Sequence, residues 1–516
     1  MAMAFPSWGS PSSQEQPVTI PAAPRGPSEH PILKEWLILV LLATIVVATQ
    51  IASLRAGHDW GDDFAQYIQQ ALNLAAGHPM VENSYIYNPS FPNLGPRAYP
   101  PGFPLLLMPV VKLAGVDLRA MKIIGIACFG LALLAIFRLL FPILPFGYCL
   151  ATIAGLGFTP FLWGLKDSIT SDIPFLCILY IALVMLQRCD TRHWLGTGPM
   201  VATGIVIYAG FAVRTAGGIL LPALIVYLLL RFQGFRRIPR GAWIVLITAG
   251  SLTAIHLEAT MRESLSYTDS VPRQSTAFFH AVHSNVMMYA WTLHYLFFPP
   301  WSSRFLSVSF CALLGGLCIW GYVSKLRSEL TMLEIFAPFY LGVILVVPWG
   351  SGRYLIPLIP LGLMYIVCAI RSLPADGKWT IRTAATAAVA GGILGSCLTD
   401  FGATNFSPIK ESFGNPDFMS VCAFLKHDTP PEAVVICKKP RLSTLVSGHR
   451  SSVYDPDASD KEQLKWFKDC GARYVLTSPA FPDDQRILKP FLERHRDLFR
   501  MTFRSGNFEI YQIDAG

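Results

Sequence analysis

The run WLILVLLATIVVATQIASL, from Trp36 to Leu54, contains no charged side chain. An α-helix needs roughly 20 apolar residues to cross the hydrocarbon core of a bilayer, so this run predicts a membrane-spanning helix. Comparable runs recur as far as Leu398, and 53% of the 516 residues are hydrophobic whereas 14% are charged. The bilayer is therefore the expected solvent of most of the chain.

Eleven apolar runs are expected to cross the membrane, which predicts an α-helical polytopic membrane protein. They are Trp36 to Leu54, Met121 to Phe141, Phe146 to Gly164, Ile173 to Leu186, Gly198 to Val213, Ala216 to Leu230, Trp243 to Leu257, Phe305 to Val323, Met332 to Val347, Tyr354 to Ile370 and Thr383 to Leu398. The segment Pro100 to Ala114 is also apolar, but it is short and carries four prolines. We expect this segment to be a re-entrant or surface-lying helix.

The distribution of Lys and Arg predicts the orientation, because short cytoplasmic loops hold the excess of these residues. The short loops of one alternate set contain eleven of them, whereas the short loops of the other set contain only Lys166, Arg214 and Arg353. We therefore expect a multi-pass protein of the plasma (inner) membrane with a cytoplasmic N-terminus and outer loops at 55–120 and 258–304. The net charge of +8 is then a topology signal and does not indicate a nucleic-acid partner.

Both ends of the chain differ in composition from the apolar module at 36–398. Residues 1–35 are rich in Pro, Ser, Ala and Gly, which predicts a disordered cytoplasmic tail. No basic start or small-residue cleavage site precedes the first run, so it is expected to be a retained anchor, with a cleaved signal as the alternative. Residues 399–516 alternate strand-like and helical runs, which predicts an extracytoplasmic α/β domain. Its strands are expected at Ala433 to Cys437, Ser452 to Tyr454, Arg473 to Thr477, Arg500 to Arg504 and Phe508 to Ile513.

The first outer loop contains the stretch HDWGDD, which ends in Asp62 and Asp63. The following run, Phe64 to Ala76, places its apolar residues on one face at helical spacing and stops at Gly77, so an amphipathic helix along the membrane surface is expected. A carboxylate at the start of this helix has two interpretations. It caps the helix and complements its dipole, or it acts as a general base at the membrane surface.

Four stretches stand in a fixed order along the chain: Asp63-x-x-x-Tyr67, the run YPPGFP from Tyr99, the run ITSDIP from Ile169 and the run GRYLIP from Gly352. Their order and their sidedness resemble the GT-C membrane glycosyltransferases. Within that superfamily they look like the branch of protein O-mannosyltransferases and bacterial aminoarabinose transferases. The resemblance covers most of the chain, and it extends to the outer domain.

This resemblance implies an inverting transfer of a sugar from a polyprenyl-phosphate donor to an acceptor hydroxyl at the outer face. It implies that Asp63 is the catalytic base, with Asp62 as the alternative. Asp172 matches a second acidic position, although a helix cap before Ile-Pro is an equal interpretation. Members of the aminoarabinose branch have a Lys where this chain has Tyr99, so the sugar of that branch is not carried over.

A donor phosphate requires cations at the outer end of the bundle. Arg353, Arg214 and Lys166 are the candidates, and snorkelling to lipid headgroups is the alternative for each. Three tyrosines in the four stretches quoted above are expected to contact the substrate: Tyr67, Tyr99 and Tyr354.

No cofactor and no metal-ligand set are assigned from the sequence, and a divalent cation is left open. His280 and His283 have a spacing that suits a metal, but the aromatic residues around them favour packing at the membrane interface. The expected partners are the polyprenyl-phosphate sugar, a lipid, glycan or protein acceptor, and membrane lipids.

Two other functions compete with sugar transfer by this chain. One is transport or flipping of a lipid-linked sugar, which is typical of inverted repeats and charges near the bilayer midplane. The halves of the sequence show no such similarity, and its acidic residues gather on the outer side. The other is a polymerase or ligase that uses a diphosphate-linked oligosaccharide.

Overall fold

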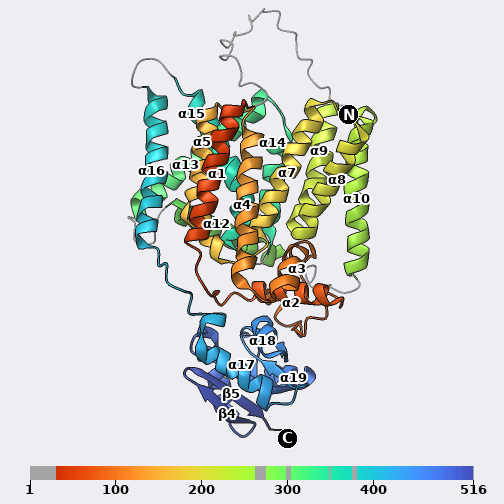
Figure 1. Ribbon diagram of the computed structural model, residues 1–516, viewed down its shortest axis with the longest axis vertical. Helices are drawn as coiled ribbons and strands as arrows, with labels where there is room; N and C mark the ends of the chain where they lie inside the picture. Colours follow the sequence, from red (N-terminus) through yellow and green to blue (C-terminus); the bar gives the residue numbers. More distant parts are fainter. Residues whose placement is uncertain (1–30, 262–274, 298–303, 348–349, 375–379, 515–516) are drawn as a thin grey trace, which may run out of the picture.

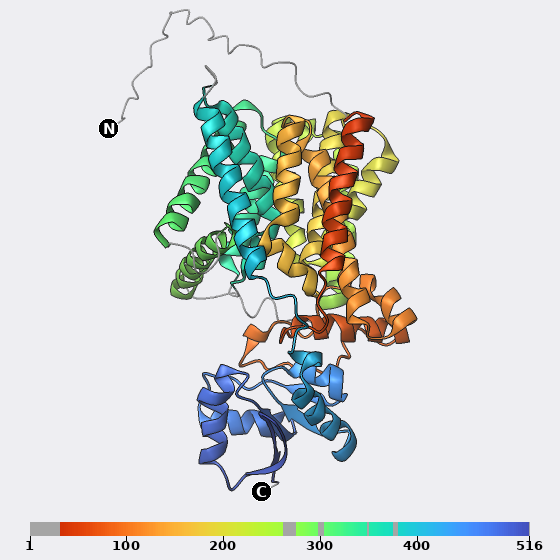
Figure 2. The ribbon, with the colours of Figure 1, turned by 60° about the vertical axis from the view of Figure 1, so that its left-hand side comes forward.

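The computed structural model describes residues 31–261, 275–297, 304–347, 350–374 and 380–514. A bundle of apolar helices forms one end of the molecule, and a small α/β domain forms the opposite end (Figures 1 and 2). The bundle contains α1 (Leu33–Ala52), α4 (Leu118–Leu140), α5 (Phe146–Phe158), α6 (Pro160–Gly164), α7 (Asp172–Thr191), α8 (Thr197–Val213), α9 (Leu220–Phe232), α10 (Arg240–Met261), α12 (Ser275–Phe297), α13 (Arg304–Ser328), α14 (Met332–Val346), α15 (Ile359–Ser372) and α16 (Ile381–Ala403).

The helices confirm the expected polytopic fold. Eight described helical segments are long and apolar enough to cross a membrane, and the pair formed by α5 and α6, bent by 46°, makes up to nine. The two other expected spans coincide with α8 and α14, which are apolar but only 17 and 15 residues long. All eleven runs predicted from the sequence are thus apolar helices.

The helix α2 (Asp63–Ala76) begins and ends where the sequence pattern predicts, and Gly77 closes it in the left-handed conformation with φ 76°. Its surroundings differ from those of a helix that only lies on a membrane. The polar side chain of Gln70 is fully buried and exchanges two hydrogen bonds with the backbone of Tyr99. On another side, α2 packs against α18 (Pro440–Ser447) of the C-terminal domain. The helix is therefore enclosed between the bundle and this domain.

The apolar segment after Tyr99 forms the short helix α3 (Gly102–Ala114), which packs beside α2 at the end of the bundle (Figure 1). Its first residue, Gly102, lies so close to the end of α8 that a Cβ atom there would stand 2.7 Å from the carbonyl of Ala212. The end of α8 leads directly into Arg214, so this contact fixes the start of α3 relative to Arg214.

Gly102→Ala is expected to lower stability by about 1–3 kcal/mol, the usual cost of overpacking. Gly125→Ala is the matched control, because nothing lies within 4 Å of a Cβ atom at Gly125 in α4. Thermal unfolding of the purified protein in one detergent measures both variants. Equal melting temperatures for the two variants would contradict the close packing of α3 on α8.

The expected outer loop at 258–304 contains the helix α12, which is 23 residues long; residues 262–274 and 298–303 lie outside the described part. The pattern did not predict this helix because His, Asn, Ser and Thr interrupt its apolar residues. Tertiary contacts hold it instead. Asn285 donates hydrogen bonds to the carbonyls of Leu345 and Val347 at the end of α14, and the Tyr289 hydroxyl donates to Ile344.

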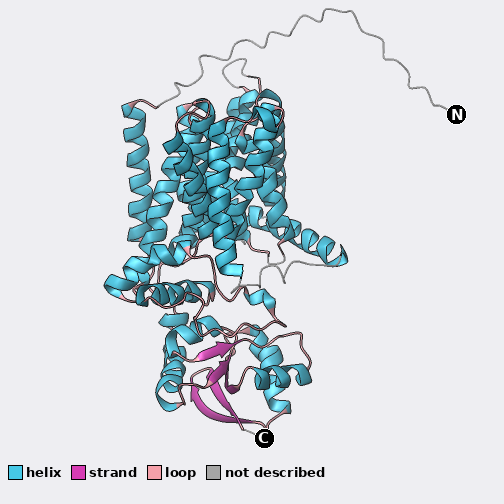
Figure 3. Cartoon of the chain, turned by 90° about the vertical axis from the view of Figure 1, so that its right-hand side faces the viewer, coloured by secondary structure: helices cyan, strands magenta, loops and turns pink. Residues whose placement is uncertain are grey.

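The described strands lie in the C-terminal domain (Figure 3). They form one five-stranded sheet in the order β2-β1-β3-β5-β4, in which β1 pairs in parallel with β2 and β3, and β4 and β5 form an antiparallel hairpin. The strands are β1 (Val434–Ile436), β2 (Arg450–Ser452), β3 (Ala472–Thr477), β4 (Phe499–Ser505) and β5 (Phe508–Ile513). The second strand begins two residues before the predicted one, and the others lie within or close to the predicted ranges.

Helices cover the sheet of the C-terminal domain: α17 (Pro416–Asp428), α18, α19 (Asp460–Asp469) and α20 (Lys489–Arg494). The first outer loop docks on this domain. Ile86 donates a backbone hydrogen bond to Ser451 of β2, and the ring of Trp60 packs edge-on against Phe418 and Phe481. The loop and the domain therefore form one continuous structure below the bundle.

Candidate active site

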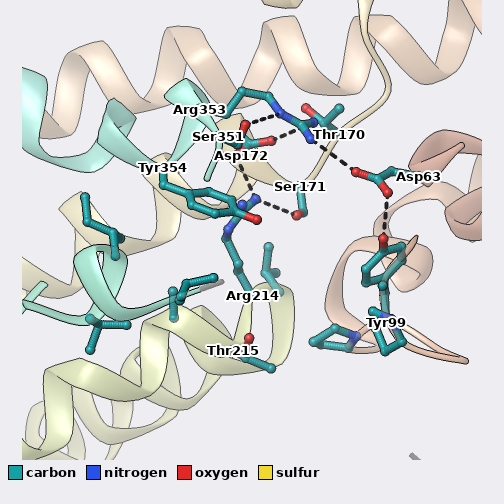
Figure 4. A pocket seen from close by; sticks show the side chains of 18 of the residues that line it. Asp63, Tyr99, Thr170, Ser171, Asp172, Arg214, Thr215, Ser351, Arg353 and Tyr354 are labelled. Atoms are coloured by element: carbon teal, nitrogen blue, oxygen red, sulfur yellow. Dashed lines mark hydrogen bonds and ion pairs between the residues drawn. The ribbon is translucent and has the colours of Figure 1, made fainter. Parts of the chain in front are cut away.

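A cavity of about 500 Å³ lies where the end of the bundle meets the first outer loop. Its walls come from α2, the segment before α3, the start of α7, the turn between α8 and α9, the end of α14 and the 3₁₀ segment Gly352–Leu358. Figure 4 shows polar side chains from several of these elements pointing toward one another. Seven sequence-predicted residues line the cavity: Asp63, Tyr67, Tyr99, Asp172, Arg214, Arg353 and Tyr354.

Asp63 is the first residue of α2, and its side chain bonds to groups outside the helix. One carboxylate oxygen accepts a hydrogen bond of 2.6 Å from the Tyr99 hydroxyl. The other lies 3.2 Å from an Nη atom of Arg353, and the side chain is 36% exposed. No side-chain cap hydrogen bond is made at the start of α2. The capping interpretation of this carboxylate is thus not supported.

Asp172 binds two arginines from different parts of the chain. One of its oxygens lies 2.7 Å from Arg214, the other lies 3.4 Å from Arg353, and its side chain is only 3% exposed. The helix cap at the start of α7 again has no side-chain hydrogen bond. Asp63, Arg353, Asp172 and Arg214 therefore form one alternating row of charges (Figure 4).

Close backbone packing fixes the two arginines. Arg214 occupies an extended residue between α8 and the next 3₁₀ turn, and a Cβ atom at Gly217 in that turn would lie 2.5 Å from the backbone of Gly210. Arg353 follows Gly352, where a Cβ atom would lie 2.7 Å from the side chain of Thr292 in α12. Larger residues at these glycines would displace the guanidinium groups.

The tyrosines complete the walls of the cavity. The Tyr67 hydroxyl lies 2.9 Å from Ser171, which also accepts a hydrogen bond from Arg214. The guanidinium of Arg214 lies 5.0 Å from the ring centre of Tyr354, a distance that suits cation–π attraction. These contacts hold Arg214 facing the cavity.

The charges around Asp63 decide its protonation. Burial alone would raise the pKa of Asp63, but the positive charges of Arg353 and Arg441 and the hydrogen bond from Tyr99 outweigh burial. Its pKa therefore lies below the ordinary value for an aspartate. The carboxylate is therefore ionised at neutral pH.

Asp62 and Lys166 do not line this cavity. Asp62 is 7% exposed, and it accepts a hydrogen bond of 3.1 Å from the backbone of Leu442 in α18. Lys166 pairs with Asp167 at 2.6 Å and borders a different cavity. The structure thus separates two residues that the sequence placed with the others.

Arg441, which sequence analysis did not single out, lies directly behind Tyr99. Its side chain is fully buried, and its guanidinium donates a hydrogen bond of 2.9 Å to the Tyr99 hydroxyl and lies 3.5 Å from Asp63. It comes from the C-terminal domain, 378 positions after Asp63. No local pattern around Arg441 could have indicated this contact.

A divalent cation in the cavity would have to be held by the two carboxylates that line it, Asp63 and Asp172. Among the described residues, no group of three or more His, Cys, Asp or Glu side chains is placed to hold a metal ion. Both carboxylates of the cavity already face guanidinium groups, whereas Mg²⁺ and Ca²⁺ require several free oxygen ligands. In this arrangement a divalent cation would compete with Arg353 and Arg214 for both carboxylates.

Comparison with known proteins identifies the fold. No family model and no curated protein sequence matches the chain. Among solved structures, ArnT from Cupriavidus metallidurans bound to undecaprenyl phosphate superposes with a TM-score of 0.51 at 14% identity, over 93% of this chain and 98% of ArnT. The chain has the GT-C fold.

A second GT-C structure is similar over much of this chain. The archaeal oligosaccharyltransferase AglB from Archaeoglobus fulgidus, in complex with an inhibitory peptide and a dolichol-phosphate, has a TM-score of 0.54 at 12% identity. The match covers 86% of this chain and 69% of AglB. The GT-C resemblance seen in the four sequence motifs is thereby confirmed at the level of the fold.

Proposed function

We propose that this protein is a membrane glycosyltransferase that moves a sugar from a polyprenyl-phosphate donor to an acceptor hydroxyl at the extracytoplasmic face. One observation carries the proposal. An ionised aspartate, Asp63, and two arginines, Arg214 and Arg353, face a single cavity at the end of a GT-C bundle. Such a cavity combines a proton acceptor with cations that suit a phosphate.

The arginines are the proposed partners of the donor phosphate. Guanidinium groups bind phosphate through paired hydrogen bonds, and the apolar residues Val343, Ile344 and Val347 of the same cavity offer a surface for a prenyl chain. The ArnT and AglB structures contain undecaprenyl phosphate and dolichol-phosphate respectively, which supports this class of donor.

Donor binding would rearrange the row of charges. A phosphate beside Arg353 competes with Asp63 for the same guanidinium, whereas Asp172 continues to hold Arg214 at 2.7 Å. Asp63 then becomes free to accept a hydrogen bond from the incoming hydroxyl. The donor thus prepares the base for the reaction.

The proposed reaction is an inverting displacement. The acceptor oxygen attacks the sugar carbon, its proton passes to Asp63, and the bond between that carbon and the phosphate oxygen breaks. Polyprenyl phosphate leaves with the additional negative charge. Arg353 and Arg214 stabilise this charge as it develops, which is usually the largest part of catalysis.

The orientation follows from the charge distribution. The short loops at the bundle end opposite the cavity hold the excess of Lys and Arg, so that end is assigned to the cytoplasm. The apolar module at 36–398 would then span the membrane, with the domain at 399–516 outside and the tail at 1–35 inside. The acceptor, whether lipid, glycan or protein, would approach from the outer side.

The test is an assay of polyprenyl phosphate release. Purified protein in lipid vesicles, given a polyprenyl-phosphate sugar and outer-envelope lipid, glycan or protein, is expected to release polyprenyl phosphate in step with acceptor glycosylation. Movement of the donor across the bilayer without release would favour a flippase. Activity only with a diphosphate-linked oligosaccharide would favour a polymerase or ligase.

A further inference from the structure

Arg441, in the C-terminal domain, contacts the first outer loop directly. Its side chain is fully buried, and its guanidinium donates a hydrogen bond of 2.7 Å to the carbonyl of Pro96 and another of 2.9 Å to the Tyr99 hydroxyl. The rings of Tyr85 and Tyr99 lie 4.9 and 5.1 Å from its central carbon. Arg441 therefore holds the segment that leads into α3.

The direction of the hydrogen bonds follows from donor chemistry. A guanidinium has no acceptor atom, so the Tyr99 oxygen must accept from Arg441. The hydrogen of the Tyr99 hydroxyl is then directed at the carboxylate of Asp63, 2.6 Å away. A relay of two hydrogen bonds, from Arg441 to Tyr99 and from Tyr99 to Asp63, therefore connects the C-terminal domain to one carboxylate oxygen of Asp63.

We propose that Arg441 is a positioning residue, which fixes the carboxylate of Asp63 by way of Tyr99 and thereby makes the C-terminal domain part of the transfer site. This inference rests on the proposed function. Arg441 does not line the cavity, so its effect reaches the substrate through Asp63.

The start of α18 holds both neighbouring carboxylates. The backbone N–H of Leu442 donates to Asp62, and the side chain of Arg441 reaches Asp63 at 3.5 Å. The two contacts come from consecutive residues of one rigid helix. They fix the beginning of α2 against the C-terminal domain from two directions.

The relay has a consequence for the pH dependence of transfer. Three groups contact Asp63 directly: Arg353 of the 3₁₀ segment, Arg441 of α18 and Tyr99 before α3. Three others lie near it: Asp62 and Tyr67 in the α2 region, and Asp172 of α7 on the far side of Arg353. Burial raises the pKa of Asp63, whereas the charges of Arg353 and Arg441 lower it. Without Arg441, Asp63 would bind its proton at a higher pH, and transfer would stop at a higher pH.

The experiment compares Arg441→Met, which keeps an unbranched apolar stem but removes the guanidinium and its charge, with Arg500→Ala. Arg500 is an exposed arginine of the same domain that bonds to Gln512. Arg441→Met is expected to lower kcat about tenfold with little change in the donor KM, and to move the acid limb of the pH–rate profile to higher pH. Arg500→Ala is expected to match the wild type. An unchanged acid limb in Arg441→Met would overturn the proposal.

Hydrogen exchange of the same preparations supplies a readout that needs no activity. Exchange in 59–70 and 95–102 is expected to rise in Arg441→Met but not in Arg500→Ala. A wild type without transferase activity would refute the proposed function, and the exchange result would still decide the role of Arg441. Equal exchange in both variants would contradict that role.

Arg441→Lys covers the case in which the Met variant unfolds. Lysine retains the charge but not the fork that reaches Pro96 and Tyr99 together. We expect the acid limb of the wild type with a lowered kcat and raised exchange in 95–102. A Lys variant that equals the wild type in kcat and exchange would overturn the proposal.

Discussion

Asp63→Asn is expected to lower the rate of polyprenyl phosphate release by about 10²- to 10⁴-fold, the range that a general base contributes. The amide has nearly the same shape and still accepts the hydrogen bond from Tyr99, but it cannot take the proton of the acceptor hydroxyl. Single-turnover release with saturating donor measures the chemical step. Normal turnover in this variant would show that Asp63 is not the base.

The matched control is Asp117→Asn, the same substitution at the N-cap of α4. Asp117 accepts a hydrogen bond from Ala120 and lies outside the cavity, and asparagine caps a helix as well as aspartate does. Expression and release rate are expected to stay at the wild-type level. Asp62→Asn should also retain most of the activity, because its amide oxygen still accepts from Leu442. Loss of release in Asp62→Asn with normal release in Asp63→Asn would assign the base to Asp62.

Arg353→Ala is expected to raise the donor KM about tenfold to a hundredfold. A hydrogen bond to a charged group contributes about 1.5–3 kcal/mol, and each 1.4 kcal/mol corresponds to a factor of ten. Donor titration at fixed acceptor concentration measures the change. An unchanged donor affinity would remove Arg353 from the phosphate site.

The same variant also shifts the pH dependence of transfer. Arg353 lowers the pKa of Asp63, so its removal raises that pKa and moves the acid limb to higher pH. Arg353→Lys is the conservative comparison, because it keeps the charge and should keep the acid limb near its wild-type position. The two arginines beside Asp63 are thus distinguishable by the donor KM: loss of Arg353 raises the donor KM and lowers kcat, whereas loss of Arg441 lowers kcat with little change in the donor KM.

The row of charges in the cavity explains how two partly buried arginines are tolerated before a donor binds. A buried cation without a partner is strongly destabilising, and here Asp172 bonds to both Arg214 and Arg353. Arg353 also pairs with the partly exposed Asp63. A donor phosphate would replace Asp63, and not the buried Asp172, as the partner of Arg353. Asp172 thus has a structural role that the helix-cap interpretation did not include.

The helix α12 was not predicted from the hydropathy of the sequence. Its polar residues place it below the hydropathy of a membrane span, yet Asn285 and Tyr289 satisfy carbonyls at the end of α14. Those bonds fix Ile344 and its neighbours in the cavity wall. Such contacts depend on which helices become neighbours, and hydropathy along the chain does not record this.

The sequence by itself determined the polytopic helical fold and the helical run from Phe64 to Ala76 behind the two carboxylates, because the length and period of apolar runs are local properties. It also indicated seven of the residues that line the cavity. Only the tertiary structure placed Asp63 in the wall of the cavity and Asp62 outside it, excluded Lys166 from the cavity and brought Arg441 to Tyr99. These outcomes depend on contacts across as many as 380 positions, and packing of the whole chain creates them.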